Sequence, residues 1–127
     1  MAVLDTSFVV DFLRNRSPAV AILSELELRE DLFVATPTVM ELWEGTLRSK
    51  LTSQNKKQVN AFLAAVTILD FDIRAAKRAA EISIDLSHSP LETEDVMIAS
   101  VALTRGETLV TRDQDYARIP GLRLLKY

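Results

Sequence analysis

The sequence predicts a single α/β domain over residues 1–127, with a mostly parallel central sheet of four or five strands flanked by helices. Three observations support this prediction. A length of 127 residues is typical of one domain. Apolar residues make up 48% of the chain, which is enough for a sizeable core. Short β-rich runs alternate with helical patterns, which is typical of βαβ units with parallel strands.

Short apolar runs rich in β-branched residues are the predicted strands. The first lies near the N-terminus and is apolar throughout, as expected for a strand that is buried on both faces. The last follows the turn formed by Pro120 and Gly121. In chain order, the predicted strands are 2–4, 32–35, 67–69, 108–111 and 122–125.

The first three helices are predicted from their starting residues. The first begins at Thr6 or Ser7, directly after the first strand. The second has Pro18 in its first turn, where proline is well tolerated. In the third, Thr36 is the predicted N-cap and Pro37 the first helical residue.

The next three helices are predicted from apolar spacing and further caps. A polar segment at 52–57 leads into the fourth. Asp72 is the predicted cap of the fifth and Thr93 of the sixth, which ends at Gly106 in a left-handed conformation. The predicted buried face of the fifth helix consists of Ile73, Ala76, Ala79, Ala80 and Ile84.

The composition excludes several kinds of site. There is no cysteine, which rules out disulfides, thiolate zinc sites and a cysteine nucleophile, and His88 is the only histidine. A net charge of −3 argues against broad, non-specific coating of nucleic acid. No signal peptide is expected, because Asp5 and Asp11 interrupt the first apolar run, and no stretch is long enough to span a membrane. A cytoplasmic protein is therefore expected.

Four acidic residues follow or open elements at the expected strand-to-helix junctions: Asp5, Glu41, Asp95 and Asp113. Taken singly, each is equally well explained as a helix cap, a first-turn acid, a solvated helix residue or a turn residue. Together they point to one edge of the sheet, because ligands of open parallel sheets bind beyond the carboxyl ends of the strands. Clustered carboxylates repel one another unless a cation lies among them, and oxygen ligands suit Mg²⁺ or Mn²⁺.

The segments around these acids resemble the motifs of PIN-domain proteins, and specifically of VapC-type toxin ribonucleases from toxin–antitoxin pairs. Each motif is weak alone, but their order and spacing together are specific, and the resemblance extends over the whole chain. The segments that carry it are 3–13, 38–45, 94–100, 109–116 and 119–122.

The resemblance implies one PIN domain over residues 1–127 and a set of functional residues. The acidic quartet is Asp5, Glu41, Asp95 and Asp113, with Asp5 and Asp95 as direct ligands of Mg²⁺ or Mn²⁺ and Asp115 as the alternative fourth acid. The implied supporting residues are Thr6, Ser7 and Thr111. The implied partners are an RNA substrate, a second copy of the chain in a homodimer, and a cognate antitoxin whose tail enters the active-site groove.

The hypothesis for the reaction is hydrolysis of RNA by metal-activated water, which leaves 5′-phosphate and 3′-hydroxyl ends. Glu41 or Asp113 is the expected group that orients the attacking water. The expected RNA-binding residues are Arg112, which adjoins the quartet, and Arg14 and Arg16.

Two alternatives remain open. One is a non-catalytic PIN-like scaffold that binds RNA or a protein partner. The other is a receiver-type signalling domain, which needs a lysine after a late strand where this chain has Thr111 and Arg112. A haloacid-dehalogenase-like phosphatase is disfavoured, because it needs an Asp-x-Asp pair and the chain has Asp5-Thr6-Ser7.

Overall fold

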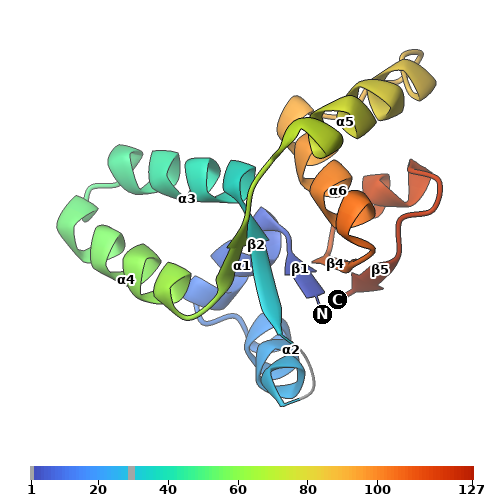
Figure 1. Ribbon diagram of the computed structural model, residues 1–127. Helices are drawn as coiled ribbons and strands as arrows, with labels where there is room; N and C mark the ends of the chain where they lie inside the picture. Colours follow the sequence, from blue (N-terminus) through green and yellow to red (C-terminus); the bar gives the residue numbers. More distant parts are fainter. Residues whose placement is uncertain (1, 29–30) are drawn as a thin grey trace.

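A computed structural model describes residues 2–28 and 31–127. Its centre is one parallel sheet with the strand order β3-β2-β1-β4-β5. Figure 1 shows helices on both sides of this sheet, which confirms the predicted fold class. The strands are β1 (Ala2–Leu4), β2 (Leu32–Ala35), β3 (Thr67–Leu69), β4 (Thr108–Thr111) and β5 (Leu124–Lys126).

Six α-helices and one 3₁₀ helix make up the rest of the described secondary structure. The α-helices are α1 (Thr6–Leu13), α2 (Ser17–Glu27), α3 (Thr36–Arg48), α4 (Thr52–Ala64), α5 (Ile73–Asp85) and α6 (Thr93–Arg105), and the 3₁₀ helix is η1 (Gln114–Arg118). In Figure 1, α3 and α4 run side by side as one pair, and α5 lies along α6 as another.

The core has two halves, one on each face of the sheet. Successive side chains of a strand point to opposite faces. In β1, Leu4 therefore packs with Phe8 and the α1–α4 side, whereas Val3 packs with the α5–α6 side, which includes Ile98. All three residues of β1 are buried, as predicted for a strand covered on both faces.

Two of the predicted helix caps are confirmed. The Asp72 side chain accepts a hydrogen bond from the Ala75 amide, and Gly106 ends α6 with a left-handed φ of 68°. Two others are wrong. The Thr36 hydroxyl accepts a hydrogen bond from the Phe71 amide and so ties α3 to the segment after β3. Ala35 occupies the N-cap position of α3, and Glu92 that of α6, neither with a side-chain cap.

The predicted buried face of α5 is largely wrong. Ala75, Ala79 and Ile82 are buried against α6, whereas Ile73 and Ile84 are each 75% exposed.

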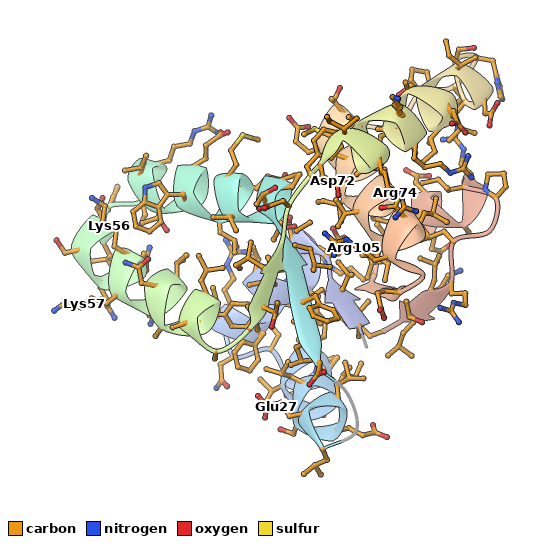
Figure 2. All side chains as sticks on the ribbon, in the orientation of Figure 1. Glu27, Lys56, Lys57, Asp72, Arg74 and Arg105 are labelled. Atoms are coloured by element: carbon orange, nitrogen blue, oxygen red, sulfur yellow. The ribbon has the colours of Figure 1, made fainter. Side chains whose placement is uncertain are left out.

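Small alanines allow α5 and α6 to pack closely, and their ends are also joined by polar contacts. Figure 2 shows Asp72 and Arg105 where α5 begins and α6 ends, with a side-chain N–O separation of 3.9 Å.

The C-terminal region also differs from the prediction. The last strand is Leu124–Lys126 rather than 122–125, and the sequence pattern did not predict the 3₁₀ helix η1. The final residue, Tyr127, packs edge-on against Phe8 at 5.1 Å between ring centroids. Its hydroxyl donates to Asp11, which is 4% exposed and lies inside α1. This contact holds the end of the chain against the first helix.

The strand order places a topological switch point between β1 and β4. The chain leaves β1 for β2 on one side, and returns to β4 on the other side. In open α/β sheets, ligands bind at such a point, beyond the carboxyl ends of the strands. Asp5 directly follows β1, and Thr111 ends β4.

In the described residues, no helix combines the length and the apolar character needed to cross a bilayer.

Candidate active site

Asp5 is the most heavily hydrogen-bonded acid at the switch point. Its side chain is a helix cap that accepts from the Thr6 amide at 2.9 Å. It also accepts from the hydroxyls of Ser7 at 3.0 Å, Thr111 at 2.7 Å and Tyr116 at 3.0 Å. With 3% of its surface exposed, Asp5 would be costly to bury without these donors. Its role as a cap and its place in the acidic cluster are therefore compatible.

Tyr116 joins Asp5 to Asp95. Its hydroxyl oxygen lies 3.0 Å from Asp5 Oδ1 and 3.1 Å from Asp95 Oδ1, so these two carboxylate oxygens are at most about 6 Å apart. The side chain is 1% exposed. Burial, followed by the charges of Asp5 and Asp95, raises the pKa of Tyr116 far above its ordinary value. The phenol therefore stays protonated and acts as a donor between the two acids.

Asp95 lies in the first turn of α6, where the helix dipole favours negative charge. Burial nevertheless raises its pKa to about 6, and the hydrogen bond from Tyr116 offsets only part of this effect. The charges of Asp5, Asp113 and Glu41 raise the pKa further, in that order. All four predicted acids are therefore close enough to interact electrostatically at one site.

Glu41 lies on the α3 side of the cluster. Its Oε1 accepts from the Thr6 hydroxyl at 2.7 Å, and the same hydroxyl lies 3.1 Å from that of buried Thr38. Burial raises the pKa of Glu41, the Thr6 hydrogen bond lowers it, and the charges of Asp5, Glu94 and Glu44 raise it. Neighbouring acids therefore add to the negative charge around Glu41.

The fourth acid lies at the start of η1. Asp113 Oδ1 accepts from the Asp115 amide and so caps this short helix, while the Asp113 amide donates to the Thr111 hydroxyl. Asp113 contributes to the raised pKa of Asp95, and Asp115 is not among its causes. The charge of Asp113 thus acts on Asp95, and the choice between Asp113 and Asp115 as the fourth acid stays a prediction.

The donor chemistry of this cluster suits a hard divalent cation, since every candidate ligand is a carboxylate oxygen. The side chains are close, but in residues 2–28 and 31–127 no three acids converge tightly enough to surround an ion. Hydroxyl groups hydrogen-bond to the carboxylates in this arrangement. The Tyr116 hydroxyl lies between Asp5 and Asp95, and the Thr6 hydroxyl donates to Glu41.

The arginines expected to bind RNA differ in their surroundings. The Arg112 Nε lies 3.1 Å from Asp11 Oδ2, and the Arg16 Nη1 lies 3.0 Å from Asp11 Oδ1. Both guanidinium groups therefore bind a buried acid of α1, although each remains about half exposed. Arg14 instead lines a small cavity that also includes Glu41. RNA binding by these arginines stays a prediction.

Sequence reasoning missed two residues of this region, Tyr116 and Asp11. Tyr116 follows the Asp113-Gln114-Asp115 segment, and a buried tyrosine needs a partner for its hydroxyl, which was the available signal. Asp11 is a charged residue among apolar neighbours of the first helix, a pattern that indicates a buried acid with basic partners. Nothing in the sequence identified those partners as Arg16, Arg112 and Tyr127.

Comparison with known proteins agrees with this geometry. Residues 2–122 match the sequence model of the PIN domain family. The chain therefore belongs to the PIN-domain family, and the receiver-type alternative is wrong. Within this family, the chain is 28% identical over 123 residues to the tRNA(fMet)-specific endonuclease VapC of Shigella flexneri. The alignment covers 94% of this chain and 92% of that relative. It is 30% identical to ribonuclease VapC2 of Rickettsia felis, and that alignment covers 95% of this chain and 93% of the relative.

Solved structures give the same result. VapBC2 from Rickettsia felis bound to a DNA fragment from their promoter has a TM-score of 0.92 at 25% identity, with 99% of this chain and 98% of that chain covered. VapBC-5 from Mycobacterium tuberculosis, a member of the VapBC family of toxin–antitoxin systems, has a TM-score of 0.74 at 26% identity, with 99% and 98% covered. These two relatives are thus named as nucleases, and both structures are of VapBC proteins, the second of which is described as a member of a toxin–antitoxin family.

The raised pKa of Asp95 predicts how the stability of the metal-free protein depends on pH. Unfolded aspartate titrates near its ordinary value of 3.8, whereas folded Asp95 holds its proton up to about pH 6. Between these values the folded state binds more protons, so the contribution of Asp95 to the free energy of unfolding falls as pH rises. We expect wild type to lose about 1–2 kcal/mol relative to Asp95→Asn between pH 4 and pH 7, allowing for partial exposure.

Urea unfolding with EDTA at several pH values measures this difference. The Asp95→Asn variant is the control, because the other carboxylates titrate in both proteins. A difference that stays constant across this range would contradict the assigned pKa shift.

Proposed function

We propose that this chain is a divalent-metal-dependent endoribonuclease and acts in the cytoplasm as the toxin of a toxin–antitoxin pair. The observation that carries the proposal is the cluster of Asp5, Glu41, Asp95 and Asp113 at the switch point of a PIN domain. The related proteins are named ribonucleases and endonucleases, which supports RNA as the substrate.

Asp5 and Asp95 are the proposed ligands of Mg²⁺ or Mn²⁺, with Glu41 and Asp113 completing the site. When bound, the ion lowers the pKa of water and neutralises charge on the scissile phosphodiester. No cysteine is present as an alternative nucleophile.

The protein residues have distinct proposed roles around that ion. The hydroxyls of Ser7 and Thr111 fix the orientation of Asp5, since both donate to its Oδ2. Thr6 likewise positions Glu41. Glu41 is the proposed general base that orients the attacking water, because burial raises its pKa towards the range in which a carboxylate accepts protons effectively. Attack by water rather than by the 2′-hydroxyl leaves 5′-phosphate and 3′-hydroxyl ends.

Cleavage of RNA in the presence of Mg²⁺ or Mn²⁺ is the direct test. Wild type is expected to cut in Mg²⁺, to stop in EDTA, and to leave 5′-phosphate ends. Asp95→Asn is expected to lower the rate at least about 100-fold while keeping the fold, since it removes a charged ligand. Asp113→Asn is expected to lower it more than the matched variant Asp115→Asn. Cyclic phosphate products, or full activity in EDTA, would contradict this mechanism.

The alternative, a non-catalytic scaffold, makes the opposite prediction. It requires RNA or partner binding without cleavage in any divalent metal. The presence of all four acids together with their supporting hydroxyls favours the enzyme, because a binding scaffold gains nothing from carboxylates that repel phosphate.

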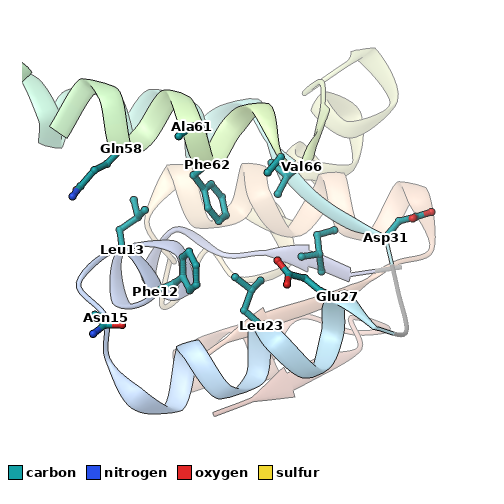
Figure 3. A pocket seen from close by; sticks show the side chains of 12 residues that line it. Phe12, Leu13, Asn15, Leu23, Glu27, Asp31, Gln58, Ala61, Phe62 and Val66 are labelled. Carbon is teal, nitrogen blue, oxygen red and sulfur yellow. The ribbon is translucent and has the colours of Figure 1, made fainter. Parts of the chain in front are cut away.

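An apolar groove between α1, α2 and α4 is the proposed docking site of the antitoxin. Its cavity volume is about 640 Å³, with walls that include Phe12, Leu23, Phe62 and Val66. Figure 3 shows these side chains facing one another, with Leu13 and Gln58 at one end and Asp31 towards the other. Grooves of this kind bind the apolar face of an amphipathic helix. Toxin–antitoxin complexes among the neighbouring structures support such an occupant.

The groove can be tested with two alanines of α4. Ala61 is exposed and lines the groove, whereas Ala64 is exposed on the same helix but does not line it. Ala61→Glu is expected to weaken binding of the antitoxin at least about tenfold, because a charge would be buried against apolar residues. Ala64→Glu is the matched control and should bind normally. Isothermal titration with the cognate antitoxin measures both, and equal affinities would contradict the assignment.

A second copy of the chain is the proposed partner of the exposed face of α5. Ile73, Ala76, Ala80 and Ile84 recur at helical spacing and are all exposed, which leaves an apolar stripe along the helix. A stripe on one helix is self-complementary, as a two-fold symmetric dimer requires. The homodimer implied by the family resemblance therefore has a suitable surface here.

Substitution on this stripe tests the dimer. Ile84→Lys places a charge in the proposed interface but should leave the fold intact, since the side chain is 75% exposed. Wild type is expected to have twice the monomer mass of 14.2 kDa by light scattering, and Ile84→Lys the mass of a monomer. Asp85→Lys, an exposed position of the same helix about 100° around it from Ile84 and outside the stripe, is the control. A dimer that survives Ile84→Lys would place the interface elsewhere.

A further inference from the structure

A second, smaller cavity lies beside the acidic cluster, between α1, α3 and α4. Its volume is about 190 Å³, below the range of about 300–1,000 Å³ typical of pockets for drug-sized molecules. Glu41 lines it, so the cavity adjoins the proposed catalytic site directly. Leu13 and Gln58 line both this cavity and the larger groove, and Figure 3 shows them at the groove's end.

Gly45 on α3 contributes a stretch of cavity wall without a side chain. It lies in the last turn of the helix, and it is not among the described glycines with positive φ, Gly106 and Gly121. Close packing does not require it either, because a Cβ atom at this position would meet nothing within 4 Å. Glycine destabilises a helix by up to about 1 kcal/mol relative to alanine. The physical consequence of glycine here is therefore space in the cavity wall.

The polar groups of the cavity offer both donors and acceptors. Asn55 uses its amide nitrogen to donate to the Ser49 hydroxyl at 2.6 Å, which leaves its carbonyl oxygen available as an acceptor. Gln58 carries both a donor and an acceptor on an exposed side chain. Arg14 adds a cation, and it forms no ion pair with any other residue in the part of the chain that the structure describes. The remaining walls, which include Val10, Leu42 and Val59, are apolar.

We propose that this cavity binds one unstacked nucleobase of single-stranded RNA, next to the scissile phosphodiester. The inference rests on the proposed ribonuclease function and adds a site that selects the cleavage sequence. A nucleobase is flat and apolar on its faces and carries donors and acceptors on its edge, which matches this combination of walls and amides. Proteins that read RNA sequence stack such splayed-out bases on aromatic rings or arginine guanidinium groups and hydrogen-bond their edges, and Arg14, Asn55 and Gln58 supply a guanidinium and two amides here. Arg14 is placed to neutralise the adjoining phosphate.

The test measures binding rather than cleavage, in the Asp95→Asn background. Short fluorescent homopolymers of A, C, G and U are titrated with this protein and followed by anisotropy. We expect tighter binding of one base type than of the others. Adding Gly45→Leu should fill the cavity and weaken binding of the preferred homopolymer about tenfold, with little effect on the others. Adding Gly45→Ala is the matched control, which keeps most of the space and should retain the preference.

Equal binding of all four homopolymers, or a preference that survives Gly45→Leu, would overturn the proposal. So would loss of antitoxin binding in Gly45→Leu without any change in RNA preference, because the cavity would then belong to the protein partner. Thermal unfolding of each variant shows whether its fold is retained, and Gln58→Ala is a second substitution in the same cavity if Gly45→Leu does not fold. Failure of wild type to cleave RNA would instead count against the ribonuclease function, since base selection is measured without cleavage.

Discussion

The structure depends on keeping a buried negative charge at the point where β1 ends. Asp5 lies at the centre of the sheet, next to the switch point, and is almost completely buried. An unpaired carboxylate there would destabilise the fold by several kcal/mol. Hydrogen bonds from four different residues of α1, β4 and η1 remove that penalty. The same acid therefore caps the first helix, joins the N-terminal and C-terminal halves of the domain, and supplies the first candidate ligand for a cation.

The other acids extend this constraint. Burial and the charges of neighbouring acids raise the pKa values of Glu41 and Asp95. The cluster is therefore electrostatically unfavourable when only protein groups are present. Hydroxyl donors relieve part of the repulsion, and the single Tyr116 proton lies within hydrogen-bond reach of both Asp5 and Asp95, to either of which it can donate. A divalent cation would relieve more of it. On this view, stability and metal binding are linked through the same carboxylates.

The sequence predicted the parts of the fold that depend on local signals. The strand and helix order, the Asp72 cap and the left-handed Gly106 all follow from nearby residues. The errors concern contacts between distant segments. Thr36 looks like a cap but bonds to Phe71, and the Ile73–Ile84 side of α5 looks like a core face but is exposed. In both cases, tertiary packing rather than local preference decides the outcome.

The same limit applies to the candidate site. Strand-end logic tied Asp5, Glu41 and Asp113 to the carboxyl edge of the sheet and placed Asp95 in the first turn of a helix that points there. The motif resemblance then implied the same four acids. Tyr116 was not identified, because its role depends on the fold of η1 over the cluster. The small cavity at Gly45 is likewise invisible in sequence, since three helices from separate segments enclose it. Leu13 and Gln58 line both this cavity and the groove proposed for the antitoxin. The two proposals together therefore predict that RNA and antitoxin compete for one continuous surface.

The acids around Asp5 are the proposed metal site of this domain. Anomalous diffraction from crystals soaked in Mn²⁺ locates the ion independently of catalysis. We expect an anomalous peak within about 2.0–2.3 Å of oxygens from both Asp5 and Asp95, with Glu41 and Asp113 alongside. A peak bound elsewhere, or none at saturating Mn²⁺ with these carboxylates unchanged, would contradict it.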